Sequence, residues 1–393
     1  MFSIWWPAFL LPLAMVLGGV AGGVLPGRKY RGPRGVLPSE EQREADRVFC
    51  RFLWQFGLVY AALAFMVMRT VRLVSLSGQR WFLIGAVAVE IIGAALMVIP
   101  VERTLHALFG EDSIVTEQAP AKINLALLVG EKHPDGYHDV TSVMQSVSLC
   151  DTVTARRTSG GTTLTCSDPT LACDETNLAY RAAALFFEES GVEGGAALTL
   201  EKVIPMQAGL GGGSSDAAAV LRALRRLYAP DMPLEELERM AIRLGSDVPY
   251  CVRGATTLVE GRGEHLTQLT ALPACWCVLC KPDIACPTGA MYGEIDRRGA
   301  HLTLDVQEML RALERGDLAA VCALVGNVFE QVIDPESDIF TIRRRLTELG
   351  ADAACMSGSG SAVFGLFTKK ETARAAQELL SQDYPRTFLT KTV

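Results

Sequence analysis

The chain has 393 residues, too many for one typical domain, so we expect two or three domains. Hydrophobic residues make up 49% of it, a high share for a soluble protein. Residues 1–110 carry eleven Lys and Arg against six Asp and Glu, whereas the remainder carries 26 against 38. The acidic remainder argues against a general nucleic-acid-binding surface, although a small anionic ligand needs only a local positive field.

The first 110 residues contain three long apolar runs, at 2–25, 52–68 and 81–101. Each is long enough, or nearly so, to cross a bilayer as a helix. Tryptophans, which favour the membrane interface, lie near the ends of these runs, at Trp5, Trp6, Trp54 and Trp81. A cleaved signal peptide explains the first run poorly, because no basic segment precedes it. We therefore predict an integral membrane region that contacts lipid through about three transmembrane helices; a soluble helical bundle is the alternative.

The basic residues between these runs predict the orientation of the chain. Seven Lys and Arg lie between the first and second runs, and three lie between the second and third. The positive-inside rule then places the N-terminus outside and everything after Val101 in the cytoplasm. Glu90, inside the third run, is costly in a bilayer and is either a functional group or a paired or protonated structural one. Some forty residues, with Arg31-Gly-Pro-Arg34, then Ser39-Glu-Glu41 and a basic helix that enters a span, faintly resemble integral membrane proteins of the SdpI immunity type.

Beyond residue 116 the hydrophobic pattern predicts a mixture of strands and helices. They interleave without a strict alternation, which favours an α+β fold over a doubly wound sheet. The eleven cysteines show neither a disulfide framework nor zinc-ligand spacing, and those at 275–280 are expected to be buried as small apolar residues. We expect strands over 121–129, 140–149, 196–203, 255–260, 275–281 and 362–367, and helices over 178–188, 217–224, 234–244, 318–329, 337–349 and 371–380.

The most informative segment is a glycine-rich loop that leads into a helix, residues 205–219. Four of the five residues from Gly209 to Gly213 are glycines, so few side chains cover the backbone N–H groups. A helix N-terminus has unpaired N–H groups and the positive end of the helix dipole, which together bind anions. We predict phosphate binding here; a flexible turn before an ordinary helix is the alternative. Gly213 stands where a Walker A motif needs lysine, so this is not a P-loop.

Three other short stretches carry groups suited to catalysis or binding. Residues 120–124 place Lys122 and Asn124 at the start of a strand, and residues 245–249 place Asp247 at a bend after a helix. Between them, Tyr137 and His138 follow a turn. Taken singly, Lys122 could be a solvated strand end and Asp247 a helix cap. The turn at 355–361 could likewise be an ordinary hairpin loop.

In this order, the four stretches make the chain from residue 116 onward resemble the GHMP small-molecule kinases. Ala121-Lys-Ile-Asn124 with Asp135-Gly-Tyr-His138 makes it most similar to the 4-diphosphocytidyl-2-C-methyl-D-erythritol kinases of non-mevalonate isoprenoid precursor biosynthesis. The resemblance implies a two-lobed fold with an active site between the lobes. We expect an N-terminal lobe over 116–270 and a C-terminal lobe over 271–393.

The resemblance also implies the roles of particular residues. Asp247 matches the catalytic carboxylate that takes the proton from the substrate hydroxyl, and Lys122 matches its partner lysine. Mg²⁺ would travel with ATP, with Ser214 or Ser215 supplying an oxygen, and no acidic metal cage is visible in the sequence. The ATP phosphates would lie on Pro205, Met206, Gln207, Ala208, Gly209, Leu210, Gly211, Gly212, Gly213, Ser214 and Ser215.

Tyr137 and His138 match residues that hold the cytosine of the substrate, and Asn124 and Thr288 fall where the family contacts the substrate. The implied reaction is phosphorylation of the 2-hydroxyl of a cytidine-diphosphate-linked methylerythritol. The sequence departs from the family pattern at Gln207, and in its membrane-like N-terminal region. Two alternatives stay open. One is a GHMP kinase acting on another small alcohol; the other is a membrane sensor or immunity-like protein whose lobe binds nucleotide without catalysis.

Overall fold

A computed structural model describes residues 114–134 and 136–393. The chain from Ser113 onward forms one compact unit. The three predicted membrane spans and Glu90 lie outside the described residues, so the membrane region stays a prediction. Within the described part of the chain, no helix has the length and apolar character needed to cross a bilayer.

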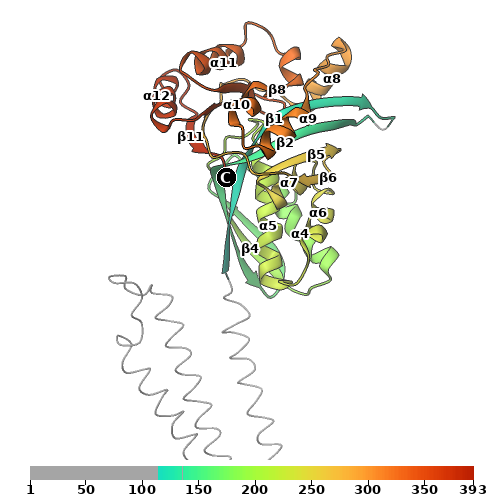
Figure 1. Cartoon of the computed structure of the whole chain (residues 1–393). Coiled ribbons are helices and arrows are strands. Elements are labelled where there is room, and N and C mark those ends of the chain that lie inside the picture. The colour runs from blue at the N-terminus through green and yellow to red at the C-terminus, as the bar shows by residue number, and fades with distance from the viewer. Residues whose placement is uncertain (1–113, 135) are drawn as a thin grey trace, which may run out of the picture. The chain divides into compact units, whose positions relative to one another are not determined.

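The first of two sheets is organised around two long antiparallel strands, β1 (Ile114–Lys132) and β2 (His138–Thr158). Its strand order is β3-β4-β2-β1-β8, and β5 pairs with both β2 and β6. Figure 1 shows β1 and β2 running from the part that contains α4 and α5 to the part that contains α8 and α9. The remaining strands of this sheet are β3 (Gly161–Cys166), β4 (Gly195–Glu201), β5 (Thr256–Gly261), β6 (His265–Gln268) and β8 (Gly326–Asn327).

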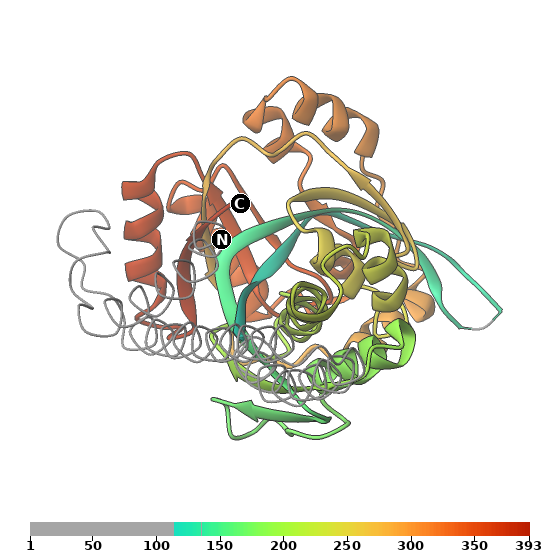
Figure 2. The same ribbon diagram turned by 90° about the horizontal axis from the view of Figure 1, so that it is seen from below.

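Three helices pack on this sheet: α4 (Leu178–Ser190), α5 (Gly212–Tyr228) and α7 (Val248–Arg253). Helix α6 (Leu234–Ala241) packs on these helices. In α5 the apolar residues Ala217, Leu221 and Leu224 recur at helical spacing, and all three are fully buried. Figures 1 and 2 show α4 and α5 beside each other against the sheet. Helix α4 begins at Asn177, whose side chain accepts a hydrogen bond from the Ala179 N–H.

The second sheet is antiparallel, with the order β11-β7-β10-β9. Its strands are β7 (Trp276–Cys280), β9 (Ala353–Met356), β10 (Val363–Phe367) and β11 (Thr387–Lys391). The associated helices are α8 (Thr288–Arg298), α9 (Val306–Glu314), α10 (Leu318–Ala323), α11 (Asp338–Glu348) and α12 (Lys370–Leu380). As expected, Cys277 and Cys280 are buried in β7, and burial raises the pKa of both thiols.

The C-terminus joins the two sheets. The Val393 N–H donates to the Ser146 carbonyl in β2 (3.1 Å), and Gln145 Nε2 donates to the Val393 carbonyl (2.7 Å). One residue earlier, the Thr392 N–H donates to the Cys275 carbonyl, next to β7 (3.1 Å). The last residues of the chain are therefore part of the junction, and Figure 1 places the C-terminus beside β1 and β2.

The α+β class is confirmed, and the predicted elements are present with one error. The expected helix over 318–329 is wrong, because α10 ends at Ala323 and is followed by β8 and the 3₁₀ helix η1 (Val328–Val332). Asn327 explains the break: its backbone is extended, and its side-chain amide donates to the carbonyls of Met356 and Gly358 (both 2.8 Å). Elements missed by the sequence analysis are β3, α7, β6, α8, α9, β9 and β11.

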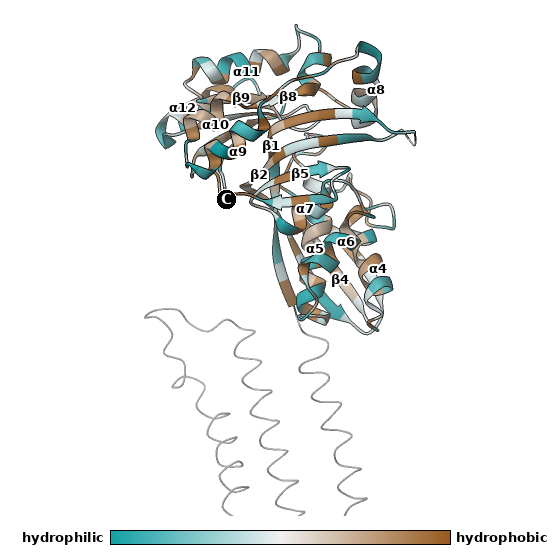
Figure 3. Ribbon diagram, turned by 45° about the vertical axis from the view of Figure 1, so that its right-hand side comes forward, coloured by the Kyte–Doolittle hydropathy of each residue, from teal (hydrophilic) through white to brown (hydrophobic). Residues whose placement is uncertain are grey.

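The hairpin formed by β1 and β2 differs in polarity along its length. Figure 3 shows a hydrophobic middle of β1 and a hydrophilic hairpin tip. Ile123 and Leu125 in the middle are fully buried, whereas Glu131 and Lys132 near the tip are exposed. Burial of the middle section fixes which face of β1 points to the core, and the alternate positions Lys122 and Asn124 are held buried on the other face.

Candidate active site

A cleft of about 1140 Å³ lies among β1, the glycine loop, α7, α8 and the β9–β10 turn. Sixteen of the seventeen predicted site residues line it. Only Ser215 does not, because it is buried and its hydroxyl donates to the Pro120 carbonyl (2.7 Å). The residues that line it are Lys122, Asn124, Tyr137, His138, Pro205, Met206, Gln207, Ala208, Gly209, Leu210, Gly211, Gly212, Gly213, Ser214, Asp247 and Thr288 with others.

Lys122 and Asp247 meet in this cleft, although 125 positions separate them. Lys122 Nζ lies 3.5 Å from Asp247 Oδ2, and the side chains are 4% and 34% exposed. Asp247 occupies the N-cap position of α7 but makes no capping hydrogen bond there. Its carboxylate therefore is not a helix cap, and it remains available to a ligand in the cleft.

Asn124 holds the Lys122 ammonium in place. Asn124 Oδ1 accepts from Lys122 Nζ (2.8 Å) and from the Gly358 N–H (2.9 Å), and its Nδ2 donates to Ser142 Oγ (2.8 Å). These contacts occupy both ends of a side chain that is 1% exposed. The geometry thus supports a positioning role for Asn124, in addition to the predicted contact with the substrate.

The glycine loop needs its glycines for close packing as well as for backbone conformation. Gly209 has φ +73°, and a Cβ there would lie 2.0 Å from the Ser357 carbonyl oxygen. Gly211, the N-cap of α5, has φ +70°, and its Cβ would lie 2.9 Å from Lys122 Cγ. At Gly213, by contrast, a Cβ would meet nothing within 4 Å among the described residues. The loop therefore rests on Lys122 and on the β9–β10 turn, and leaves its Gly213 side open.

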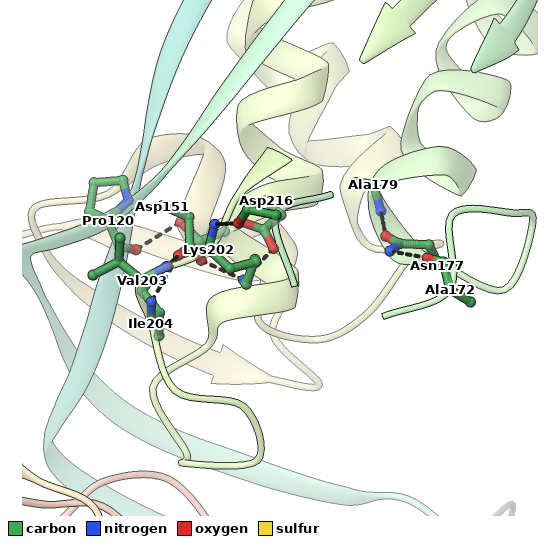
Figure 4. Close-up of polar contacts among 11 residues, drawn as sticks. Pro120, Asp151, Ala172, Asn177, Ala179, Lys202, Val203, Ile204 and Asp216 are labelled. Atoms are coloured by element: carbon green, nitrogen blue, oxygen red, sulfur yellow. Dashed lines mark hydrogen bonds and ion pairs between the residues drawn. The ribbon is translucent and has the colours of Figure 1, made fainter. Parts of the chain in front are cut away.

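A buried charge cluster supports the loop from behind. Lys202 Nζ donates to Asp151 Oδ2 and to Asp216 Oδ2 (2.6 Å), as Figure 4 shows. Asp151 also accepts from the Ile204 N–H (2.8 Å), which orders the segment that enters the loop. Burial raises the pKa of Asp216 to about 7, although Lys202 opposes this shift. Lys202 lies in the cleft lining, so its ammonium, paired with these two carboxylates, stands beside the loop; the sequence analysis gave Lys202 no role.

The other end of the cleft contains the predicted base-binding residues. Tyr137 is 60% exposed, and the Arg262 guanidinium lies 5.2 Å from its ring centroid. His138 is buried and stacks on Tyr292 with ring centroids 5.1 Å apart. Thr288 Oγ1 lies 2.9 Å from Ser359 Oγ in the β9–β10 turn. That turn, treated above as a possible ordinary hairpin loop, does join β9 and β10 and also lines the cleft.

Two residues of this end were missed in the sequence analysis, Tyr292 and Asp296 of α8. Burial, followed by the charge of Asp247, raises the pKa of Tyr292 to about 12. Asp296 pairs with both Lys132 and His138. Tyr292 and Asp296 are four residues apart and therefore lie on one face of α8. Gly289 and Gly293 weaken the helical pattern in the sequence that would have revealed this face.

Comparison with known proteins places the chain in a family. The GHMP kinases N terminal domain matches residues 177–255, and the GHMP kinases C terminal domain matches residues 309–386. The 4-diphosphocytidyl-2-C-methyl-D-erythritol kinase of Exiguobacterium sibiricum is 43% identical over 259 residues, which are 65% of this chain and 90% of that protein. The enzyme of that name from Geobacillus kaustophilus is 44% identical over 253 residues, 63% of this chain and 87% of the relative. The chain belongs to the 4-diphosphocytidyl-2-C-methyl-D-erythritol kinase family.

Solved structures agree with this assignment. A crystal structure of a 4-(cytidine 5'-diphospho)-2C-methyl-D-erythritol kinase superposes with a TM-score of 0.61 at 36% identity, over 71% of this chain and 99% of that one. The homoserine kinase of Cytophaga hutchinsonii, at 18% identity and a TM-score of 0.57, shares the fold. The GHMP kinase fold of the described residues is thereby confirmed.

The contacts of the glycine loop predict different outcomes at two of its glycines. Gly209→Ala places a methyl group against the Ser357 carbonyl and strains the backbone, which costs at least about 1–3 kcal/mol. We expect a lower melting temperature and loss of ATP binding. Gly213→Ala, the matched control, meets no described atom and favours the helix, so its melting temperature should not fall.

Thermal unfolding and ATP titration of both variants test this prediction. A Gly209→Ala protein with unchanged melting temperature and ATP affinity would contradict the packing described here. If phosphate approaches the open side of the loop, Gly213→Ala should still raise the KM for ATP, because its methyl group occupies that space.

Proposed function

We propose that this chain is an ATP-dependent small-molecule kinase that phosphorylates the 2-hydroxyl of 4-diphosphocytidyl-2-C-methyl-D-erythritol. The observation that carries the proposal is the convergence of Lys122 and Asp247 beside a glycine loop at a helix N-terminus. The curated relatives at 43% and 44% identity bear the name of this activity, and the chain spans nearly their whole length. This reading is therefore preferred to a kinase for another alcohol and to a non-catalytic lobe.

The proposed mechanism uses the Lys122–Asp247 pair on one hydroxyl group. Asp247 accepts the proton as the hydroxyl oxygen attacks the γ-phosphorus, and the bond from that phosphorus to the β–γ bridging oxygen breaks to release ADP. The Lys122 ammonium stabilises the negative charge that develops on the attacking oxygen and on the transferred phosphoryl group. Asn124 fixes the position of that ammonium by accepting a 2.8 Å hydrogen bond from it.

The α5 N-terminus and the loop from Pro205 to Ser214 are proposed to hold the ATP phosphates. The first N–H groups of a helix have no partner within the helix, and the dipole adds positive charge there. The Ser215 hydroxyl donates to the Pro120 carbonyl, so it ties α5 to β1 and does not contact the ligand. Phosphoryl transfer then depends on alignment and charge neutralisation, which the loop and Lys122 can supply.

A divalent cation fits this site as a companion of the nucleotide. The described residues contain no group of three or more His, Cys, Asp or Glu side chains arranged for a metal. Mg²⁺ carried on ATP would need few protein ligands, because phosphate and water would supply most of its oxygen ligands. With Ser215 committed to Pro120, Ser214 is the loop hydroxyl that would contact it. When bound, the cation neutralises charge on the β- and γ-phosphates.

Cytidine is proposed to bind between β2 and α8. Tyr137 is an exposed aromatic residue suited to stacking on a pyrimidine, and His138 and Thr288 offer hydrogen-bonding groups at the same end of the cleft. The diphosphate and the methylerythritol would then extend toward Lys122 and Asp247.

Removal of the proposed base tests the mechanism. Asp247→Ala should lower kcat by about 10²–10⁴-fold, because general-base catalysis is lost, while ATP still binds. Asp231→Ala is the matched control, since Asp231 is an exposed aspartate outside the cleft lining. Steady-state rates and ATP titration of both variants decide the point. A wild-type rate in Asp247→Ala would refute the assignment of the base.

The base-binding role of Tyr137 makes a separate prediction. Tyr137→Ala should raise the KM for the cytidine substrate about tenfold, because aromatic stacking on a base contributes ~1–3 kcal/mol. The KM for ATP, measured on the same variant, serves as the control and should stay near its wild-type value. An unchanged KM for the cytidine substrate would mean that another group reads the pyrimidine.

We further propose that the N-terminal region anchors the kinase at the cytoplasmic face of a membrane. The apolar runs at 2–25, 52–68 and 81–101 and the basic residues between the first two support this proposal. The full chain should stay in the membrane pellet after alkaline carbonate extraction. Added protease should digest the kinase region in inverted vesicles and spare it in right-side-out vesicles. Release by carbonate, or the reverse protease pattern, would contradict the anchor or its orientation.

A further inference from the structure

One carboxylate of α8 holds both strands of the β1–β2 hairpin at its tip. Asp296 Oδ2 accepts from Lys132 Nζ (2.6 Å), and Asp296 Oδ1 lies 2.7 Å from His138 Nε2. Lys132 is the last residue of β1 and His138 the first of β2, and the two are directly paired across the hairpin. Asp296 therefore contacts a matched pair of residues at the point where the hairpin meets α8.

The His138 ring is held on two sides by the same helix. Tyr292, four residues before Asp296, stacks on the imidazole at an interplanar angle of 23°. The His138 side chain is 5% exposed, compared with 32% for Asp296 and 52% for Lys132. A stacked and nearly buried ring with a 2.7 Å contact at one nitrogen has little freedom to turn. The partner of Nε2 therefore also decides whether Nδ1 is a hydrogen-bond donor or acceptor.

Asp296 determines the position of the imidazole proton. The hydrogen bond from Lys132, followed by that from His138, lowers the pKa of Asp296, so this carboxyl is ionised near neutral pH. An ionised carboxylate only accepts hydrogen bonds, and the proton between the two groups must therefore reside on Nε2. A neutral imidazole that donates from Nε2 has a lone pair at Nδ1, which then accepts.

We propose that Asp296 is a positioning residue that makes this site select cytosine over uracil, through the tautomer of His138. The inference rests on the proposed function, because it assumes that a pyrimidine binds at this end of the cleft. Cytosine has a 4-amino group, which donates, whereas uracil has a carbonyl oxygen at the same position, which accepts. His138 Nδ1, as an acceptor, pairs with the amino group of cytosine. It cannot pair with the carbonyl oxygen of uracil, because that oxygen is also an acceptor.

Asp296→Asn tests the proposal with purified full-length protein. A carboxamide can turn either its oxygen or its NH₂ group toward His138, so it imposes no tautomer. With the cytidine substrate, kcat/KM should fall about tenfold, the effect of about one hydrogen bond. The ratio of kcat/KM for the cytidine substrate to that for its uridine analogue should fall by at least as much, and the KM for ATP should not change.

Two control variants separate the tautomer from other effects. Lys132→Gln removes the ion pair at the hairpin tip but keeps the Asp296 contact with His138, so the cytidine-to-uridine ratio should be preserved. Glu294→Gln changes another carboxylate of α8, which pairs with Arg297 and Arg298, and should leave all rates unchanged. The ¹⁵N shifts of His138 should report the Nε2–H tautomer in the wild type and in both controls, and a mixture in Asp296→Asn.

The outcomes distinguish this inference from the proposed function. If the wild type phosphorylates neither substrate, the proposed function itself fails. If the wild type prefers the cytidine substrate and Asp296→Asn keeps the same ratio, only the role of Asp296 is overturned. An equal collapse of the ratio in Lys132→Gln would likewise overturn it, because the hairpin contact and not the tautomer would then set the selectivity.

Discussion

The burial of the Lys122 ammonium is the constraint on which the rest of the site depends. A buried cation is costly unless charged and polar partners surround it. Here a carboxylate from α7 and an amide from β1 meet that requirement, and the glycine loop closes over the aliphatic part of the side chain. Each partner comes from a different element, so the site can form only when the long strand, the loop and α7 are all in place.

The constraint also explains why the loop glycines and the β9–β10 turn are packed so closely. The Lys122 N–H donates to the Leu210 carbonyl (2.9 Å), and Ser357 Oγ donates to the Gly209 carbonyl (3.0 Å). A loop tied on both sides has its N–H groups set before any ligand arrives. Preorganised donors of this kind stabilise developing charge without reorganisation during the reaction.

Much of this site could be predicted from the sequence, because its main groups lie in short motifs. The glycine loop was recognised from its own composition, and Lys122 and Asp247 from the resemblance of their motifs to the GHMP kinases. The structure brings all three together. The partners Lys202, Tyr292 and Asp296 could not be recognised in that way. Their roles come from contacts across the fold, such as that of Asp296 with a hairpin 158 positions away. The wrong helix at 318–329 has a similar cause, since Asn327 is held extended by carbonyls about thirty residues later.

The hydrogen bond from Val393 to Ser146 limits which changes residues 392 and 393 can tolerate. The final two residues contribute hydrogen bonds to both sheets, so a deletion of even this length would unpair backbone groups where the two halves of the kinase meet. A purification tag added there would begin at a bonded strand end and would need a spacer before its first bulky residue.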